Sequence, residues 1–70
     1  MAATVRICVN GDPMEVAGGT TVTALLDLLH VEPAQIAVEL DGRIVQRERW
    51  FDLLIAPGAT LEIVRFVGGG

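Results

Sequence analysis

The three consecutive glycines that end the sequence carry the group in this chain best suited to chemistry. Gly68, Gly69 and Gly70 have no side chains, so they add nothing to a core and would lose conformational entropy on ordering. We expect a flexible tether that can thread a narrow channel, with an inert frayed terminus as the alternative. The α-carboxylate of Gly70 is ionised at neutral pH. It is therefore expected to attack the α-phosphate of a nucleotide held by another protein.

Few other residues offer reactive groups. Cys8 and His30 are the only cysteine and the only histidine, and their spacing does not indicate a nucleophile paired with a base. No cluster of residues has the spacing of a zinc site, and Gly18-Gly19 lacks the further glycines and the lysine of a phosphate-binding loop. We therefore expect no catalytic residues and no metal. His30, near the end of a predicted helix, is expected to interact with the helix dipole.

The length and composition limit the chain to one small domain. It has 70 residues, of which 51% are hydrophobic, and nine acidic residues against five arginines give a net charge of −4. This charge argues against binding to nucleic acids or anionic membranes. The longest apolar stretches fall far short of the roughly 20 residues of a membrane span, and the start of the chain lacks the pattern of a secretory signal. We expect a soluble cytoplasmic domain.

The first residues predict a β-hairpin. Apolar and polar side chains alternate over residues 5–9, as in a strand with one buried face. Asn10-Gly11 is typical of a two-residue turn, because both positions tolerate a positive φ. Asp12-Pro13 is expected to widen the turn before a second strand over residues 14–16.

One helix is expected after the hairpin. Thr20 or Thr21 can cap its N-terminus through the side-chain hydroxyl. Pro33 prevents any continuation, because its ring clashes with the preceding turn. The spacing i, i+3, i+4 and i+7 gives the helix one apolar stripe, made of Val22, Leu25, Leu26 and Leu29.

The second half predicts three more strands and no second helix. Residues 36–40 alternate as a third strand, and Asp41-Gly42 predicts a hairpin turn to a short fourth strand over residues 43–45. The remaining segments are an irregular turn at residues 46–52, a type II turn at Pro57-Gly58 and a final strand at residues 60–67.

This order of elements predicts an α+β fold of the β-grasp (ubiquitin-like) type. A mixed sheet of four to five strands would pack on one main helix, with the first and last strands adjacent. The expected domain spans residues 1–67, and the flexible glycine tail spans residues 68–70. Its expected core consists of Val5, Ile7, Val9, Val22, Leu25, Leu26, Leu29, Val38, Leu40, Leu61 and Ile63.

The end of the last strand is the predicted partner-binding region. If Leu61 and Ile63 face the helix, Val64 and Phe66 project from the opposite face of the sheet. Exposed apolar residues there suit docking onto a partner, although scattered exposed apolar side chains are also common. Val67, which adjoins the tail, completes this predicted partner-binding set.

Other distinctive residues have ordinary structural interpretations. Cys8 is expected to be a small, half-buried apolar residue. Trp50 and Phe51 are expected to cover the core. Arg47 and Arg49 are expected on the solvated surface, with an acidic partner as the alternative.

The sequence resembles the ThiS family of ubiquitin-like sulfur carriers over nearly its whole length. The last segment, with its glycine tail, is the most specific, while the middle segments would fit many small β-grasp proteins. Gln46 departs from the family, which often has a proline before the arginine. The matching segments are Val9-Asn10-Gly11, Met14-Glu15-Val16, Thr20-Thr21-Val22, Leu25-Leu26, residues 37–45, residues 47–50 and residues 62–70.

The resemblance implies a carrier that binds no cofactor of its own. A ThiF-like adenylating enzyme would use ATP and Mg²⁺ to adenylate Gly70, and sulfur from a cysteine desulfurase or another sulfur donor would replace AMP. The resulting thiocarboxylate would donate sulfur to thiazole synthase (ThiG) in thiamine biosynthesis. In this scheme Gly68 and Gly69 form the tether.

Three alternatives remain open at this point. One is a sulfur carrier of another pathway, such as the small subunit of molybdopterin synthase or a carrier for cysteine synthesis. The second is a ubiquitin-like modifier joined to lysines of other proteins. The third is an interaction module with an inert tail.

Overall fold

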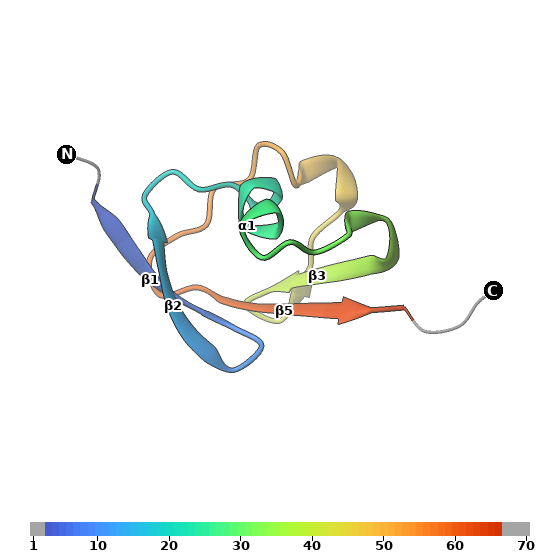
Figure 1. Ribbon diagram of the computed structural model, residues 1–70, viewed down its shortest axis with the longest axis horizontal. Helices are drawn as coiled ribbons and strands as arrows, with labels where there is room; N and C mark the ends of the chain where they lie inside the picture. Colours follow the sequence, from blue (N-terminus) through green and yellow to red (C-terminus); the bar gives the residue numbers. More distant parts are fainter. Residues whose placement is uncertain (1–2, 67–70) are drawn as a thin grey trace.

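The computed structural model describes residues 3–66 and shows one sheet packed on one helix (Figure 1). One 3₁₀ turn follows the helix and a second follows the fourth strand. The elements are β1 (Thr4–Val9), β2 (Asp12–Ala17), α1 (Val22–Leu28), η1 (Pro33–Gln35), β3 (Ile36–Leu40), β4 (Arg43–Ile44), η2 (Arg47–Arg49) and β5 (Thr60–Arg65).

The sheet is mixed and has five strands in the order β2-β1-β5-β3-β4. The first and last strands are adjacent and parallel, and the other neighbours are antiparallel. The helix covers one face of the sheet (Figure 1). The predicted α+β, β-grasp arrangement is therefore confirmed.

Both hairpins turn through an Asx-Gly pair in the left-handed region. Asn10 and Gly11 have φ of 51° and 86°, and Asp41 and Gly42 have the same pair of values. Such turns match the twist of the strands that they join. The prediction that Asp12-Pro13 widens the first turn is wrong, because β2 already begins at Asp12. A proline is tolerated there because β2 is an edge strand.

Local hydrogen bonds mark both ends of the helix α1. Thr21 is its N-cap, and the Thr21 side chain accepts a hydrogen bond from the backbone N–H of Ala24 at 3.1 Å. The chain leaves the helix through His30, which has a φ of 56° and donates its backbone N–H to the carbonyl of Asp27. The helix is too short to cross a membrane, and residues 3–66 contain no other helix that is long and apolar enough to do so.

The core lies between α1 and the inner face of the sheet. Four expected members, namely Val5, Leu29, Leu40 and Ile63, are only partly buried and pack against it. The sequence pattern missed Val16, Ile36, Ile55 and Ala59, most of which lie at segment ends or in turns, whereas Trp50 is buried in line with its expected place over the core. The buried apolar residues are Ile7, Val9, Val16, Val22, Leu25, Leu26, Ile36, Val38, Trp50, Ile55, Ala59 and Leu61.

Two predicted strands are shorter than expected. Strand β4 ends at Ile44 rather than Val45, and β5 ends at Arg65 rather than at residue 67. The division into a domain of residues 1–67 and a tail of residues 68–70 falls outside the described residues and stays a prediction.

Candidate docking surface at the end of strand β5

Strand β5 presents apolar side chains on both of its faces. Leu61 is fully buried and Ile63 is partly buried, both toward the helix. Val64 is 46% exposed and Phe66 is 58% exposed, which confirms the expected exposure of these two side chains. Their role in binding a partner stays a prediction. Val67, the third predicted binding residue, lies outside the described residues, as do Gly68, Gly69 and Gly70.

The outer face of the sheet extends this apolar surface across two more strands. Val64 pairs with Ala37 of β3, and Ile44 of β4 pairs with Glu39, the next outward residue of β3. Directly paired residues share a face of the sheet. We call Ala37, Ile44, Val64 and Phe66 the outer patch.

Two carboxylates that directly oppose each other adjoin the outer patch, and Glu39 lies between Ile44 of β4 and Glu62 of β5. Glu39 and Glu62 are cross-strand partners of β3 and β5. Two like charges in this position destabilise a sheet. The face is therefore apolar and acidic together, which complements a partner surface that is apolar and basic.

The residue that follows β5 is attached to the η1 turn, just before β3. The backbone N–H of Phe66 donates to the carbonyl of Gln35 at 2.8 Å. Gln35 ends the η1 turn, and the Arg47 guanidinium binds both flanks of this turn. Its two terminal nitrogens donate to the carbonyls of Pro33 at 2.6 Å and Ile36 at 2.9 Å.

Arg47 is an exposed residue, as expected, but its guanidinium is held by contacts within the chain. Besides its two carbonyl bonds, the Arg47 guanidinium stacks 4.5 Å from the centre of the Trp50 ring. Trp50 is buried, as expected, and its indole N–H donates to the carbonyl of Val45 at 3.1 Å. These contacts join η2 to the start of β3. Arg49 fits the surface expectation, because it is exposed and lies 3.6 Å from Asp52.

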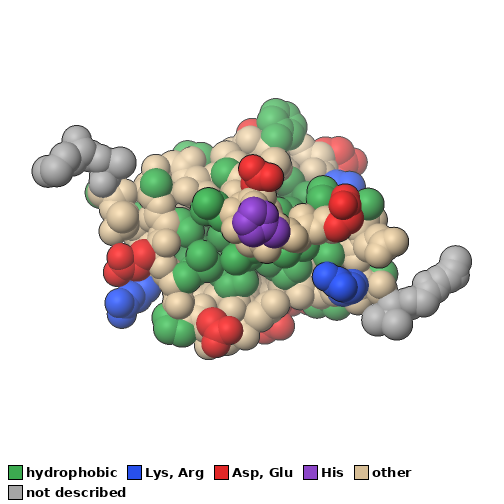
Figure 2. Space-filling model, viewed as in Figure 1, with side chains coloured by type: hydrophobic (Ala, Val, Ile, Leu, Met, Phe, Trp, Pro, Cys, Tyr) green, Lys and Arg blue, Asp and Glu red, His purple; other side chains and the backbone are tan. Residues whose placement is uncertain are grey.

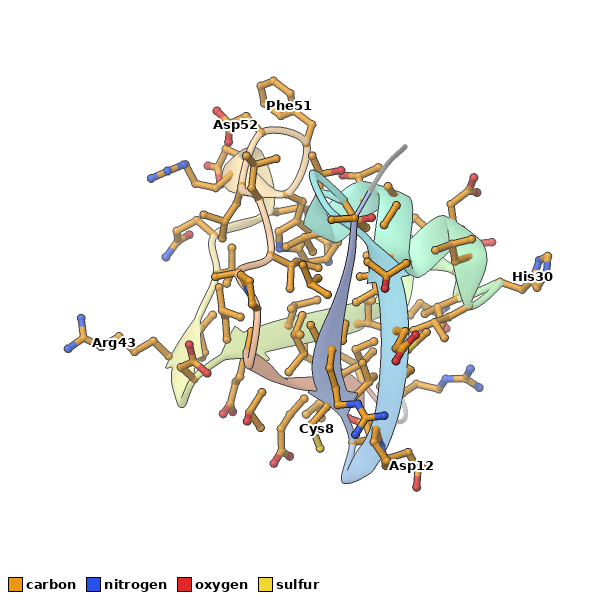
Figure 3. The ribbon with its side chains drawn as sticks, turned by 90° about the vertical axis from the view of Figure 1, so that its left-hand side faces the viewer. Cys8, Asp12, His30, Arg43, Phe51 and Asp52 are labelled. Carbon is orange, nitrogen blue, oxygen red and sulfur yellow. The ribbon has the colours of Figure 1, made fainter. Side chains whose placement is uncertain are left out.

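Phe51 differs from the expectation that it covers the core. Its side chain is 71% exposed and lies on the helix side of the molecule, far from the outer face of the sheet (Figure 3). Its neighbour Trp50 already fills the core position, so the turn carries Phe51 outward. It is the most exposed large apolar side chain among the described residues.

The remaining candidates do not assemble into a reactive site. Cys8 is a half-buried free cysteine of β1, as expected, and points away from the helix. His30 projects from the far end of the helix (Figure 3), so the two residues are not brought together. No group of three potential metal ligands occurs among residues 3–66.

Comparison with known proteins relates the chain to one family. A model described as the ThiS family matches residues 7–70. The sulfur carrier protein ThiS of Escherichia coli K12 is 31% identical over 65 residues, which cover 93% of this chain and 98% of that protein. The crystal structure of the thiamine biosynthesis protein ThiS from Geobacter metallireducens has a TM-score of 0.82 and 36% identity. It covers 94% of this chain and 100% of the solved one.

A second kind of relative is much longer than this chain. A thiazole synthase of Paramagnetospirillum magneticum is 35% identical over 65 residues, which cover 93% of this chain. The chain spans about a fifth of the length of the thiazole synthases that it matches. These relatives therefore hold a segment similar to this chain within a larger polypeptide.

Proposed function

Because this chain belongs to the ThiS family, we propose that it carries sulfur for thiamine biosynthesis as a thiocarboxylate on Gly70. The observation that carries the proposal is the extent of the family match. It runs through residue 70 and so includes the glycine tail. In this role the chain is a protein co-substrate of its partners and has no catalytic activity of its own.

The proposed chemistry takes place in two steps on the carboxylate of Gly70. A carboxylate oxygen attacks the α-phosphate of ATP in a ThiF-like adenylating enzyme, and Mg²⁺-bound pyrophosphate leaves. In the second step, the terminal sulfur of a donor persulfide, such as that of a cysteine desulfurase, attacks the acyl carbon and releases AMP, and a thiol reductant then cleaves the S–S bond of the resulting acyl disulfide to leave the thiocarboxylate. The acyl phosphate makes this exchange possible because AMP is a far better leaving group than hydroxide. Gly68 and Gly69 are the tether, and these steps take place in the cytoplasm.

The proposed acceptor of the sulfur is thiazole synthase. Its support is the occurrence of a segment similar to this chain within two thiazole synthases. A carrier domain and its acceptor enzyme in one polypeptide have a high effective concentration for each other. The same relatives favour thiamine biosynthesis over the other sulfur-transfer pathways.

The outer patch, with Val67, is the proposed surface for these partners. Phe66 is the last described residue before the tail, so a partner that covers Val64 and Phe66 is positioned to receive residues 67–70. Aromatic side chains at the centre of an interface often supply a large share of the binding energy. Glu39 and Glu62 add two carboxylates to which basic partner residues would bind.

Intact-mass measurement tests the proposal. The full chain is produced in cells together with an adenylating enzyme and a sulfur supply, beside a variant that lacks Gly70. We expect a species heavier by the difference between one sulfur and one oxygen atom, and we expect it to be absent from the variant. An unmodified mass beside an adenylating enzyme that is active on its own carrier would contradict the proposal. High-mass adducts with other proteins would indicate a modifier instead.

A further inference from the structure

Strand β5 is paired with β1 only over its first residues and not at the end that leads to the tail. On the β1 side, the strand pairing stops at Val9 and Leu61. Beyond that pair, β1 turns away at Asn10, and a groove of about 340 Å³ follows, lined in part by Met14, Leu29 and Ile63. Apolar side chains gather in the middle of the face of the molecule shown in Figure 2. The last residues of β5 are thus flanked by a strand on the β3 side only.

The side chain of Asn10 makes hydrogen bonds that a further residue of β1 would otherwise make to β5. The backbone N–H of Asn10 donates to the carbonyl of Leu61 at 2.9 Å. Its side-chain oxygen accepts the backbone N–H of Ile63 at 2.7 Å, and its side-chain nitrogen lies 3.4 Å from the carbonyl oxygen of Ile63. An amide side chain resembles a peptide group, so Asn10 continues the hydrogen bonding of β1 by one further step along β5.

These contacts lie close to the residues that lead into the tail. Ile63 is followed directly by Val64 of the outer patch, and Phe66 is bound to Gln35 on the other side of β5. The end of β5 is therefore held between β3 and the side chain of one turn residue. We propose that Asn10 is a positioning residue, which fixes the direction in which β5 leaves the sheet and so the delivery of Gly70 to the adenylating enzyme. This inference rests on the proposed function.

The second hairpin turn supplies a matched control. Asp41 has the same φ of 51° and also precedes a glycine. Its backbone N–H donates to the carbonyl of Thr60 at 2.8 Å, and its side-chain oxygen accepts the N–H of Thr60 at 2.9 Å. The bonding resembles that of Asn10, but it is made to the start of β5, at the end opposite to the tail.

The first test measures the strand itself by amide hydrogen exchange in the full-length chain. Glycine adopts a positive φ without strain, so Asn10→Gly and Asp41→Gly keep their turns and remove one side chain each. We expect Asn10→Gly to speed exchange at Ile63 by about fivefold or more, as the loss of one hydrogen bond implies. Asp41→Gly should do the same at Thr60 and leave Ile63 unchanged. Equal exchange at Ile63 in the wild type and Asn10→Gly would overturn the structural premise.

The second test measures adenylation by pyrophosphate release with the cognate adenylating enzyme. Because the outer patch is retained, we expect KM of Asn10→Gly to stay within about twofold, while kcat falls about tenfold, in line with the cost of a misplaced reacting group. Asp41→Gly should leave both constants near the wild-type values. Asn10→Asp keeps the 2.7 Å acceptor and should recover most of kcat.

The outcomes separate this inference from the proposed function. Release of no pyrophosphate with the wild-type chain, from an enzyme active on its own carrier, would contradict the proposed function. Adenylation of the wild type together with equal kcat values for Asn10→Gly and Asp41→Gly would overturn the role of Asn10 alone. A lower kcat for Asn10→Gly only, recovered by Asn10→Asp, would support it.

Discussion

The two faces of the sheet place their apolar residues in different environments. On the inner face, Ile7, Val38 and Leu61 are almost completely excluded from water against the helix. On the outer face, Val64 and Phe66 remain about half exposed although they belong to the same end of the chain as Leu61. Alternation along a strand places successive side chains on opposite faces. We therefore expect stability and the proposed partner binding to depend on alternate residues of the strand, so that each can be changed separately.

The largest expected effect is the loss of an inner-face side chain. Leu61→Ala should lower the free energy of unfolding by about 2–5 kcal/mol, because it leaves a cavity in the packed core. That is a large share of the stability of a 70-residue domain. Val64→Ala, on the outer face of the same strand, should cost less than about 1 kcal/mol. Urea denaturation measures both, and similar losses would contradict the separation of the two faces.

The next effect concerns the arginine that joins η2 to the start of β3. Arg47→Ala should lower the free energy of unfolding by about 1.5–3 kcal/mol, because charged hydrogen bonds to two carbonyls are lost. Arg49→Ala removes the same charge from an exposed position and should cost less than about 0.5 kcal/mol. Thermal denaturation compares the two variants. Equal melting temperatures would show that the carbonyl contacts of Arg47 contribute little.

Arg47 also illustrates what the sequence pattern could not reveal. Its hydrogen-bond partners, Pro33 and Ile36, lie 14 and 11 residues away in the chain and come close only after the fold is formed. Ile55 and Ala59 were missed for a related reason. They are buried in a segment without regular periodicity, whose backbone bonds to Thr20 and Cys8. Periodicity predicts faces of strands and helices, and it carries no information on such turns.

The parts that were predictable depend on local chemistry. The Asn10-Gly11 and Asp41-Gly42 turns, the Thr21 cap and the apolar stripe of α1 all follow from neighbouring residues, and the structure has each of them. The outward position of Val64 and Phe66 followed from alternation alone. Trp50 and Phe51 were both expected to cover the core. Composition does not show which of two successive aromatic side chains faces inward, and the turn buries only Trp50.

The outer patch can be tested against another exposed aromatic residue, Phe51, which lies elsewhere on the molecule. Phe66→Asp should raise KM for adenylation about tenfold or more, as for an aromatic residue at the centre of an interface. Phe51→Asp places the same charge on the helix side of the molecule, away from the patch (Figure 3), and should leave KM unchanged. Both variants should keep their stability within about 1 kcal/mol of the wild type, because each replaced side chain is exposed. A normal adenylation rate for Phe66→Asp would exclude the patch as the docking surface.

The smallest expected effect has opposite signs for stability and for binding. Glu62 faces Glu39 directly across β5 and β3, so Glu62→Gln should raise the free energy of unfolding by about 0.2–0.5 kcal/mol at low ionic strength. Urea denaturation with 1 M NaCl should reduce this gain, since salt screens the repulsion. The same variant should raise KM for adenylation about twofold, because a basic partner loses one carboxylate. We expect basic residues of the proposed partner to neutralise this carboxylate pair on binding. If Glu62→Gln gains stability and its KM does not change, Glu39 and Glu62 do not contribute to binding. The docking surface would then consist of the apolar side chains alone.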